Sequence, residues 1–167
     1  EVQRERDAVI KATGVRATTL LRLTGDKGTN YVDTYPQARL IDEIERHIES
    51  TRPETLVIPP PSYNQDHRAC YEAALTAARP HDRLPFVKRV LVYEEPETWG
   101  TLRQAQRHAG MYYRPLDIER KLSLYRLYAS QVRDHRSPHM IRAIAAVRGM
   151  QANMPYAEAF EVLRWVE

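Results

Sequence analysis

The sequence has only one cysteine, Cys70, and this scarcity excludes several classes of site. A single cysteine cannot form an internal disulfide, and it cannot build a zinc or iron-sulfur centre that needs several thiolates. A chain without disulfides suits a reducing compartment, so we expect a cytoplasmic location. Cys70 itself is most simply interpreted as a small buried hydrophobic residue.

Long apolar runs and concentrated charge are also missing. No stretch approaches the roughly 18 apolar residues of a membrane span, and the opening EVQRERDAVI resembles neither a signal peptide nor a transit peptide. The 25 basic and 22 acidic residues are interspersed, so we expect a chain with no membrane span and no nucleic-acid partner. A helical interaction or nucleic-acid module is a further alternative, based on the pI of about 9.1; it requires a contiguous basic face.

Glycine is scarce, so the elements are predicted from hydrophobic spacing and helix caps. Helices and strands alternate over the first 93 residues. The predicted helices are 1–12 (ending at Gly14), 34–50 and 66–80, and the predicted strands are 18–23, 55–58 and 86–93. This alternation predicts an α/β fold, a Rossmann-like three-layer sandwich with a mostly parallel sheet. Because the run TLVI at 55–58 is apolar on successive residues, we expect it to be buried on both faces.

The last third of the chain has helical spacing. Apolar residues predict a helix over 117–133, and Ser137-Pro138 is a typical start for a second helix that ends at Gly149. Asn153 and Pro155 precede a third apolar stripe that begins at Ala157, which we interpret as another helix. We therefore expect one domain over residues 1–167, with a helical C-terminal third packed on the sheet.

Chemistry-bearing residues concentrate where a predicted strand meets a helix, in LVIPPPSYNQDHRAC (56–70). Ligands of open α/β sheets bind at this carboxyl edge. His67 falls in the first helical turn, where the helix dipole favours the neutral imidazole that binds metals. Asp66 could orient that imidazole or simply cap the helix. From spacing alone a capping residue beside a surface histidine is the commoner arrangement, and one histidine cannot hold zinc by itself.

Several segments, in order, resemble the PIG-L/LmbE family of metal-dependent N-deacetylases. Asp66-His67-Arg68 before an Ala-rich helix resembles the family's second metal-binding motif. The opening RERDAVIKATGV and the helix ending at Arg52-Pro53 resemble its earlier helices. The remaining matches are LDIERKLSLYRLYASQ (116–131), Arg136-Ser137, AAVRG (145–149) and YAEAF (156–160). The resemblance covers nearly the whole chain.

The resemblance implies a zinc-dependent hydrolase that removes acetyl from an N-acetyl amino sugar, either a small molecule or a glycoconjugate. His67 would be a metal ligand. The family's Pro-His-Pro-Asp-Asp-Glu motif, which supplies the other ligands and the general base, is absent from the sequence. We therefore expect an N-terminally truncated chain that is inactive alone. The alternative is a non-catalytic sugar- or partner-binding relative that keeps only the fold.

The resemblance also suggests roles around His67. Asp66 and Asn64 are the candidate catalytic residues, although Asn64 stands where many relatives have histidine and cannot act as a general acid at neutral pH. Arg68, Asp26 and Tyr63 are the candidate substrate-binding residues. Each has a structural alternative: an ion pair for Arg68, a turn residue for Asp26 and a packed ring for Tyr63.

Overall fold

The computed structural model describes residues 2–16, 31–95 and 111–167. The described residues form two compact units. One contains the described residues of Glu1–Thr18 and Tyr112–Ala159, and the other those of Thr19–Met111 and Phe160–Glu167. The predicted strand at 18–23 lies outside the described residues.

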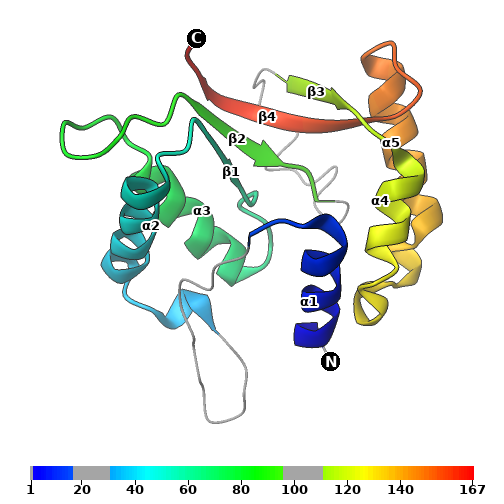
Figure 1. The fold of residues 1–167 in the computed structure, drawn as a ribbon, viewed down its shortest axis with the longest axis horizontal. Coiled ribbons are helices and arrows are strands. Elements are labelled where there is room, and N and C mark those ends of the chain that lie inside the picture. Colours follow the sequence, from blue (N-terminus) through cyan, green and yellow to red (C-terminus); the bar gives the residue numbers. More distant parts are fainter. Residues whose placement is uncertain (1, 17–30, 96–110) are drawn as a thin grey trace. The chain divides into compact units, whose positions relative to one another are not determined.

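The second unit is an α/β arrangement (Figure 1). Its elements are η1 (Val32–Thr34), α2 (Gln37–Thr51), β1 (Thr55–Ile58), α3 (Gln65–Ala77) and β2 (Arg89–Tyr93). β1 pairs with β2 in parallel, with Ile58 opposite Val92. β2 pairs antiparallel with the C-terminal part of β4 (Ala157–Trp165), with an irregularity between Val90 and Leu91. The strand carboxyl ends of β1 and β2 therefore lie at the same edge.

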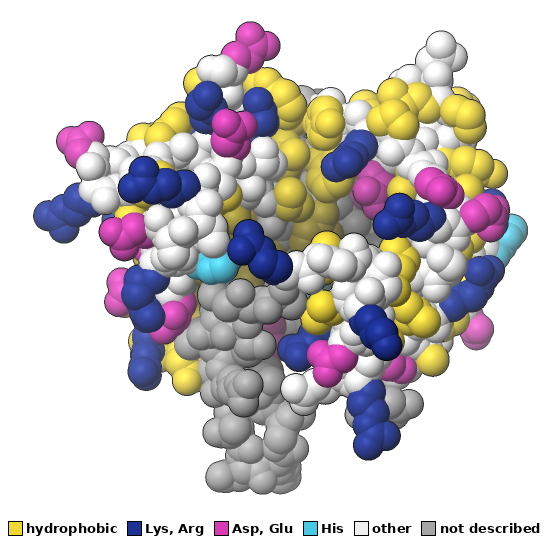
Figure 2. Space-filling view, viewed as in Figure 1, with side chains coloured by type: hydrophobic (Ala, Val, Ile, Leu, Met, Phe, Trp, Pro, Cys, Tyr) yellow, Lys and Arg dark blue, Asp and Glu magenta, His cyan; other side chains and the backbone are white. Residues whose placement is uncertain are grey.

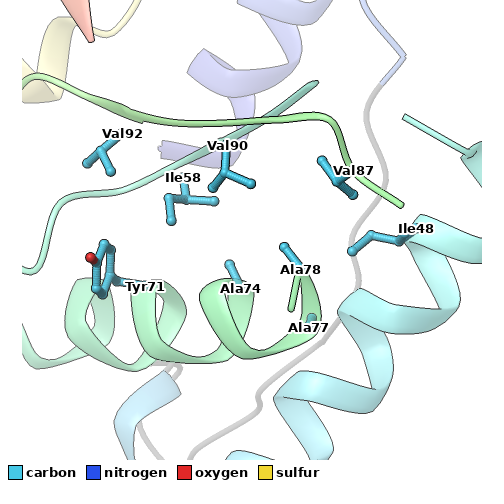
Figure 3. Packing of buried hydrophobic residues seen from close by; sticks show 9 residues of the cluster. All are labelled: Ile48, Ile58, Tyr71, Ala74, Ala77, Ala78, Val87, Val90 and Val92. Carbon is cyan, nitrogen blue, oxygen red and sulfur yellow. The ribbon is translucent and has the colours of Figure 1, made fainter. Parts of the chain in front are cut away.

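The core of this unit lies between the strands and α3. In Figure 3 the side chains of Ile58, Val90 and Val92 point toward α3, which presents Tyr71 and Ala74 to them. The small alanine side chains let the helix approach the strands closely, which is how a packed interior excludes voids. The complete buried cluster is Ile48, Ile58, Tyr71, Ala74, Ala77, Ala78, Val87, Val90 and Val92.

The first unit contains α1 (Val2–Thr13), β3 (Met111–Pro115), α4 (Ile118–Tyr125), η3 (Ala129–Gln131), η4 (Asp134–Arg136) and α5 (Pro138–Gln151). α1 ends just before Gly14, whose φ of 70° is the left-handed conformation that glycine adopts readily. Ser137 caps α5 by accepting a hydrogen bond from the Met140 N–H, as predicted. α4 and α5 share a core of Ile118, Leu122, Ile141 and Ala145.

The predicted α/β class is confirmed, but the prediction of a mostly parallel sheet is wrong. The four-stranded sheet has the order β1-β2-β4-β3 and is mixed, because β2 and β4 run antiparallel. β4 covers the residues that we interpreted as a third C-terminal helix. Its buried residues Ala157 and Ala159 alternate with partly exposed Glu158, which is a period of two rather than 3.6. The spacing of the apolar residues from Ala157 onward is compatible with both a helix and a strand, so spacing alone did not distinguish them.

Two further predictions were wrong in part. The helix expected over 117–133 ends at Tyr125, and the chain continues in 3₁₀ turns. The Tyr125 hydroxyl lies within hydrogen-bond distance of the carbonyl groups of Gln131 (3.0 Å) and Arg136 (2.7 Å) in the segment that follows. β1 is not buried on both faces, since Val57 is 48 % exposed.

In the described part of the chain, no helix is both long and apolar enough to cross a membrane. The single domain stays a prediction.

Gly149 provides a test of the packing of α5. A Cβ at this position would lie 2.6 Å from the Met154 carbonyl oxygen and 2.7 Å from that of Pro155. Alanine normally stabilises a helix relative to glycine. Here we expect Gly149→Ala to lower the free energy of unfolding by about 1–3 kcal/mol, because backbone atoms must move. Urea unfolding measures the change. Ala146→Ser on the exposed face of α5 is the control, and an unchanged or more stable Gly149→Ala protein would contradict the packing.

Glu5 predicts a pH dependence of stability. The Ser130 hydroxyl donates to Glu5 Oε2 and its N–H donates to Oε1 at 2.8 Å, and these bonds lower the pKa of Glu5 from its ordinary value. A depressed carboxyl pKa contributes stability that is present above the unfolded value and is lost as the pH falls through the folded value. The stability difference between the wild type and Glu5→Gln should therefore be largest near pH 7 and vanish in acid. Asp7→Asn, which removes an exposed pair with Arg6, should show little of this pH-dependent difference.

Candidate metal-binding site

The candidate site lies where the chain leaves β1 and β2. After Ile58 the chain passes through three prolines, and the N–H of Ser62 donates to the Pro60 carbonyl at 2.9 Å before α3 begins. After Tyr93 it continues to Glu95. Because β1 and β2 are parallel, the residues that follow both strands meet at one edge. The histidine of α3 and the glutamate after β2 are therefore brought together.

Asn64 fixes the start of α3. Its side-chain oxygen accepts a hydrogen bond from the Asp66 N–H at 2.9 Å, and its own N–H donates to Ser62 Oγ at 3.2 Å. The helix therefore begins at Gln65, and His67 occupies the third helical position. The side-chain cap replaces a bond that the first turn of a helix otherwise lacks.

His67 is held through a single ring nitrogen. Its Nδ1 lies 2.8 Å from Glu95 Oε1 and 3.1 Å from Ser62 Oγ. The Glu95 side chain is 16 % exposed and that of His67 is 34 % exposed. The contacts of His67 with the described residues all run through Nδ1, so Nε2 is the nitrogen that could bind a metal ion.

The shared nitrogen excludes a serine nucleophile of the usual kind. In a Ser-His-acid arrangement the serine contacts one imidazole nitrogen and the carboxylate contacts the other. Here Ser62 and Glu95 both face Nδ1. His67 in this orientation cannot take a proton from Ser62 while the carboxylate supports the opposite side of the ring.

Asp66 does not contact the His67 imidazole, although its position next to His67 in the sequence suggested that it could. Its Oδ1 accepts a hydrogen bond from the Asp33 N–H at 3.0 Å, which ties the start of α3 to η1. The carboxylate that contacts the His67 ring is that of Glu95. Asp66 thus lies beside His67 in the sequence but connects two segments of backbone.

Arg68 and Tyr63 lie on the same loop. Arg68 Nη1 donates to the carbonyl groups of Ser62 (3.2 Å) and Tyr63 (3.3 Å), so its guanidinium holds the turn between β1 and α3. The Tyr63 ring is 78 % exposed rather than packed. Asp26, the third candidate substrate-binding residue, lies outside the described residues.

Tyr93 and Cys70 both have raised pKa values. Burial, followed by the negative charge of Glu95, raises the pKa of Tyr93 to about 12. Burial, followed by the charge of Asp66, also raises the pKa of Cys70. Tyr93 and Cys70 are consequently uncharged at neutral pH. The Tyr93 hydroxyl lies 3.5 Å from Glu95 Oε1, at the long limit for a hydrogen bond.

Glu95 was not among the residues that the sequence analysis singled out. It follows the end of β2 by two residues, and the rule that placed His67 at the sheet edge applies equally to this position. No motif surrounds it, so the only available signal was its distance from the strand. Within residues 2–16, 31–95 and 111–167 no group of three or more His, Cys, Asp or Glu residues could hold a metal ion.

The Asn64 cap can be tested by its effect on stability. Asn64→Ala removes the acceptor of the Asp66 N–H, so the free energy of unfolding should fall by about 1 kcal/mol. Asn64→Asp keeps an acceptor oxygen at the same position and should remain within a few tenths of a kcal/mol of the wild type. Denaturant midpoints of the three proteins measure this. Equal losses in both variants would show that the cap is not what the substitution removes.

Residues 2–78, which include α1, α2, β1 and α3, match the family model PIG-L, described as GlcNAc-PI de-N-acetylase. The crystal structure of the conserved protein TT1542 from Thermus thermophilus has a similar fold. Its TM-score is 0.66 at 17% identity, over 99% of this chain and 74% of that one. The search of curated proteins gave no match. The resemblance that the motifs indicated is therefore confirmed: over residues 2–78 this chain resembles the PIG-L family of de-N-acetylases.

Proposed function

We propose that the protein is a metal-dependent hydrolase that removes the acetyl group from an N-acetyl amino sugar. The observation that carries the proposal is the position of His67. This histidine lies in the first turn of α3 at the carboxyl edge of β1, inside the segment that matches the family, with one ring nitrogen held and the other turned to no described partner.

The donor set fits one ligand position of a zinc site. Histidines that bind zinc commonly donate their second ring N–H to a carboxylate, and Glu95 stands 2.8 Å from Nδ1. Catalytic zinc usually takes three protein ligands and a water. The described residues supply His67 alone, so the remaining ligands would come from outside this part of the chain.

A zinc ion held there would supply Lewis-acid polarisation of the acetyl carbonyl. The chain's own groups would bind and orient the sugar. Asn64 has its side-chain oxygen engaged with the Asp66 N–H, which leaves its amide NH₂ to donate to a sugar hydroxyl. Asp66 holds the Asp33 N–H with Oδ1, and its Oδ2 would accept a hydrogen bond or a proton on the substrate side.

Tyr63 and Arg68 would shape the edge of the substrate site. The exposed Tyr63 ring offers an apolar face to a sugar. Arg68 Nη1 donates to two backbone carbonyl groups of the loop. We propose that its remaining N–H groups contact a sugar hydroxyl or phosphate. Asp26 remains a candidate substrate contact on the basis of the resemblance alone.

The charge distribution supports a small-molecule or glycoconjugate substrate over a nucleic acid. Figure 2 shows basic and acidic side chains interspersed over the face that it draws. Nucleic-acid binding typically needs a contiguous basic surface. We retain a cytoplasmic location as part of the proposal, based on the single cysteine.

Because the described residues supply only one metal ligand, the activity is tested on the zinc-supplemented full-length protein, which is incubated with N-acetylglucosamine and its phosphoinositol, nucleotide and thiol-linked derivatives. Release of a free amine together with acetate in equal amounts would support the proposal. Zinc binding without deacetylation of any of these would favour the alternative, a relative that binds sugars or a partner without catalysis.

His67→Ala should abolish zinc binding, because it removes the only described residue placed to be a ligand. Elemental analysis of the purified protein measures the zinc content. His139→Ala is the matched control, since His139 is exposed in the first turn of another helix, α5, and its loss should leave the zinc content unchanged. A His67→Ala protein with wild-type zinc content would reject the ligand assignment.

A further inference from the structure

We propose that Glu95, and not the adjacent Asp66, sets the tautomer and orientation of the His67 ring, so that the lone pair of Nε2 is the one presented to a ligand. Glu95 would thus be a positioning residue for the metal site. The consequence for zinc rests on the proposed function, whereas the tautomer itself does not.

The distance between Glu95 Oε1 and His67 Nδ1 requires a proton between the two atoms. At 2.8 Å a carboxylate oxygen and an unprotonated ring nitrogen would direct lone pairs at each other. A carboxyl group is a stronger acid than an imidazolium, so the proton belongs on Nδ1. The contact is then a hydrogen bond to a charged acceptor, which is among the strong kinds in proteins. A neutral imidazole has one N–H, so Nε2 is then the unprotonated nitrogen.

Ser62 supports the same tautomer without competing for it. Its Oγ lies 3.1 Å from Nδ1 and accepts the Asn64 N–H at 3.2 Å. Ser62 Oγ can therefore accept a second, weaker hydrogen bond from the Nδ1–H group. If the carboxylate were removed, the serine hydroxyl could turn and donate to Nδ1, and the ring would gain its proton at Nε2 instead.

The alternative partner, Asp66, is engaged elsewhere. Its Oδ1 accepts from the Asp33 N–H at 3.0 Å, and its backbone N–H is held by Asn64. Glu95, in contrast, follows the end of β2 and contacts the ring at the sheet edge, with only 16 % of its side chain exposed. Partial exclusion of water strengthens its hydrogen bond with the ring.

The tautomer can be read directly in the metal-free protein. Long-range ¹H–¹⁵N correlation spectra of a ¹⁵N-histidine sample near pH 8 distinguish a protonated from an unprotonated ring nitrogen. In the wild type, His67 should show a protonated Nδ1 and an unprotonated Nε2. The reverse pattern in the wild type would overturn the proposal, whatever any variant does.

Three substitutions locate the cause. Glu95→Leu removes both acceptor oxygens at similar size and should shift His67 toward the Nε2–H tautomer. Asp66→Asn should leave the wild-type pattern, because Asp66 contacts the Asp33 N–H and not the ring. Glu43→Leu, at a carboxylate paired with Arg46 on α2, controls for the loss of a charge. A shift in Asp66→Asn but not in Glu95→Leu would assign the role to Asp66 and reject the proposal.

Zinc affinity supplies a second readout. Loss of a carboxylate that orients a ligating histidine typically weakens metal binding about 10–100-fold. We expect Glu95→Leu to weaken zinc binding by that factor in a competition titration with a chromophoric chelator, with Glu43→Leu equal to the wild type. Equal affinity in Glu95→Leu would overturn the positioning role.

The two proposals fail separately. A wild type that binds no zinc but shows the Nδ1–H tautomer would reject the metal-dependent function and retain the role of Glu95 in orienting the ring. A wild type that binds zinc through His67 but shows the Nε2–H tautomer in the metal-free state would retain the function and reject the role of Glu95.

Discussion

The parallel pairing of β1 with β2 is the constraint on which the candidate site depends. Because Ile58 and Val92 lie opposite each other, the segments after both strands leave the sheet at the same edge. His67 reaches this edge from α3 and Glu95 reaches it directly after β2, and their side chains meet at 2.8 Å. Residues 28 positions apart in the sequence are thus joined by backbone geometry rather than by a local motif.

The segment around His67 is held from several directions. Asn64 caps α3, Asp66 ties that cap to η1, and the Arg68 guanidinium holds the preceding turn by its carbonyl groups. Each of these bonds satisfies a backbone group that would otherwise lack a partner at the helix start or in the turn. The polar residues that resemble the family motif therefore fix the loop as well as furnishing candidate chemistry, and the two roles are compatible.

The sequence was informative where hydrophobic spacing was unambiguous. The apolar run at 55–58, the amphipathic stripe of α2 and the cap at Ser137 each predicted an element that the structure contains. It failed at Ala157–Trp165, because apolar residues there fit a helix and a strand equally, and pairing with β2 decides the outcome. It also failed beyond Tyr125, where a tertiary hydrogen bond from the tyrosine hydroxyl accompanies the end of the helix.

The site residues named from the sequence stay a prediction, and the sequence indicated only part of the contacts around His67. Strand-to-helix position was enough to single out His67, but the sequence could not tell which carboxylate would face its ring. Asp66 was the nearer residue along the chain, and Glu95 is the one in contact. Contacts made across a sheet edge depend on strand order and register, and neither was determined by the spacing of the residues.

The most direct test of the central claim is X-ray absorption spectroscopy at the zinc edge of the zinc-loaded wild type and of its His67→Ala variant. The wild type should show imidazole nitrogen scattering at about 2.0–2.1 Å from the metal, with the contribution of one imidazole lost in the variant. A zinc environment without imidazole, or one that is identical in both proteins, would contradict the account.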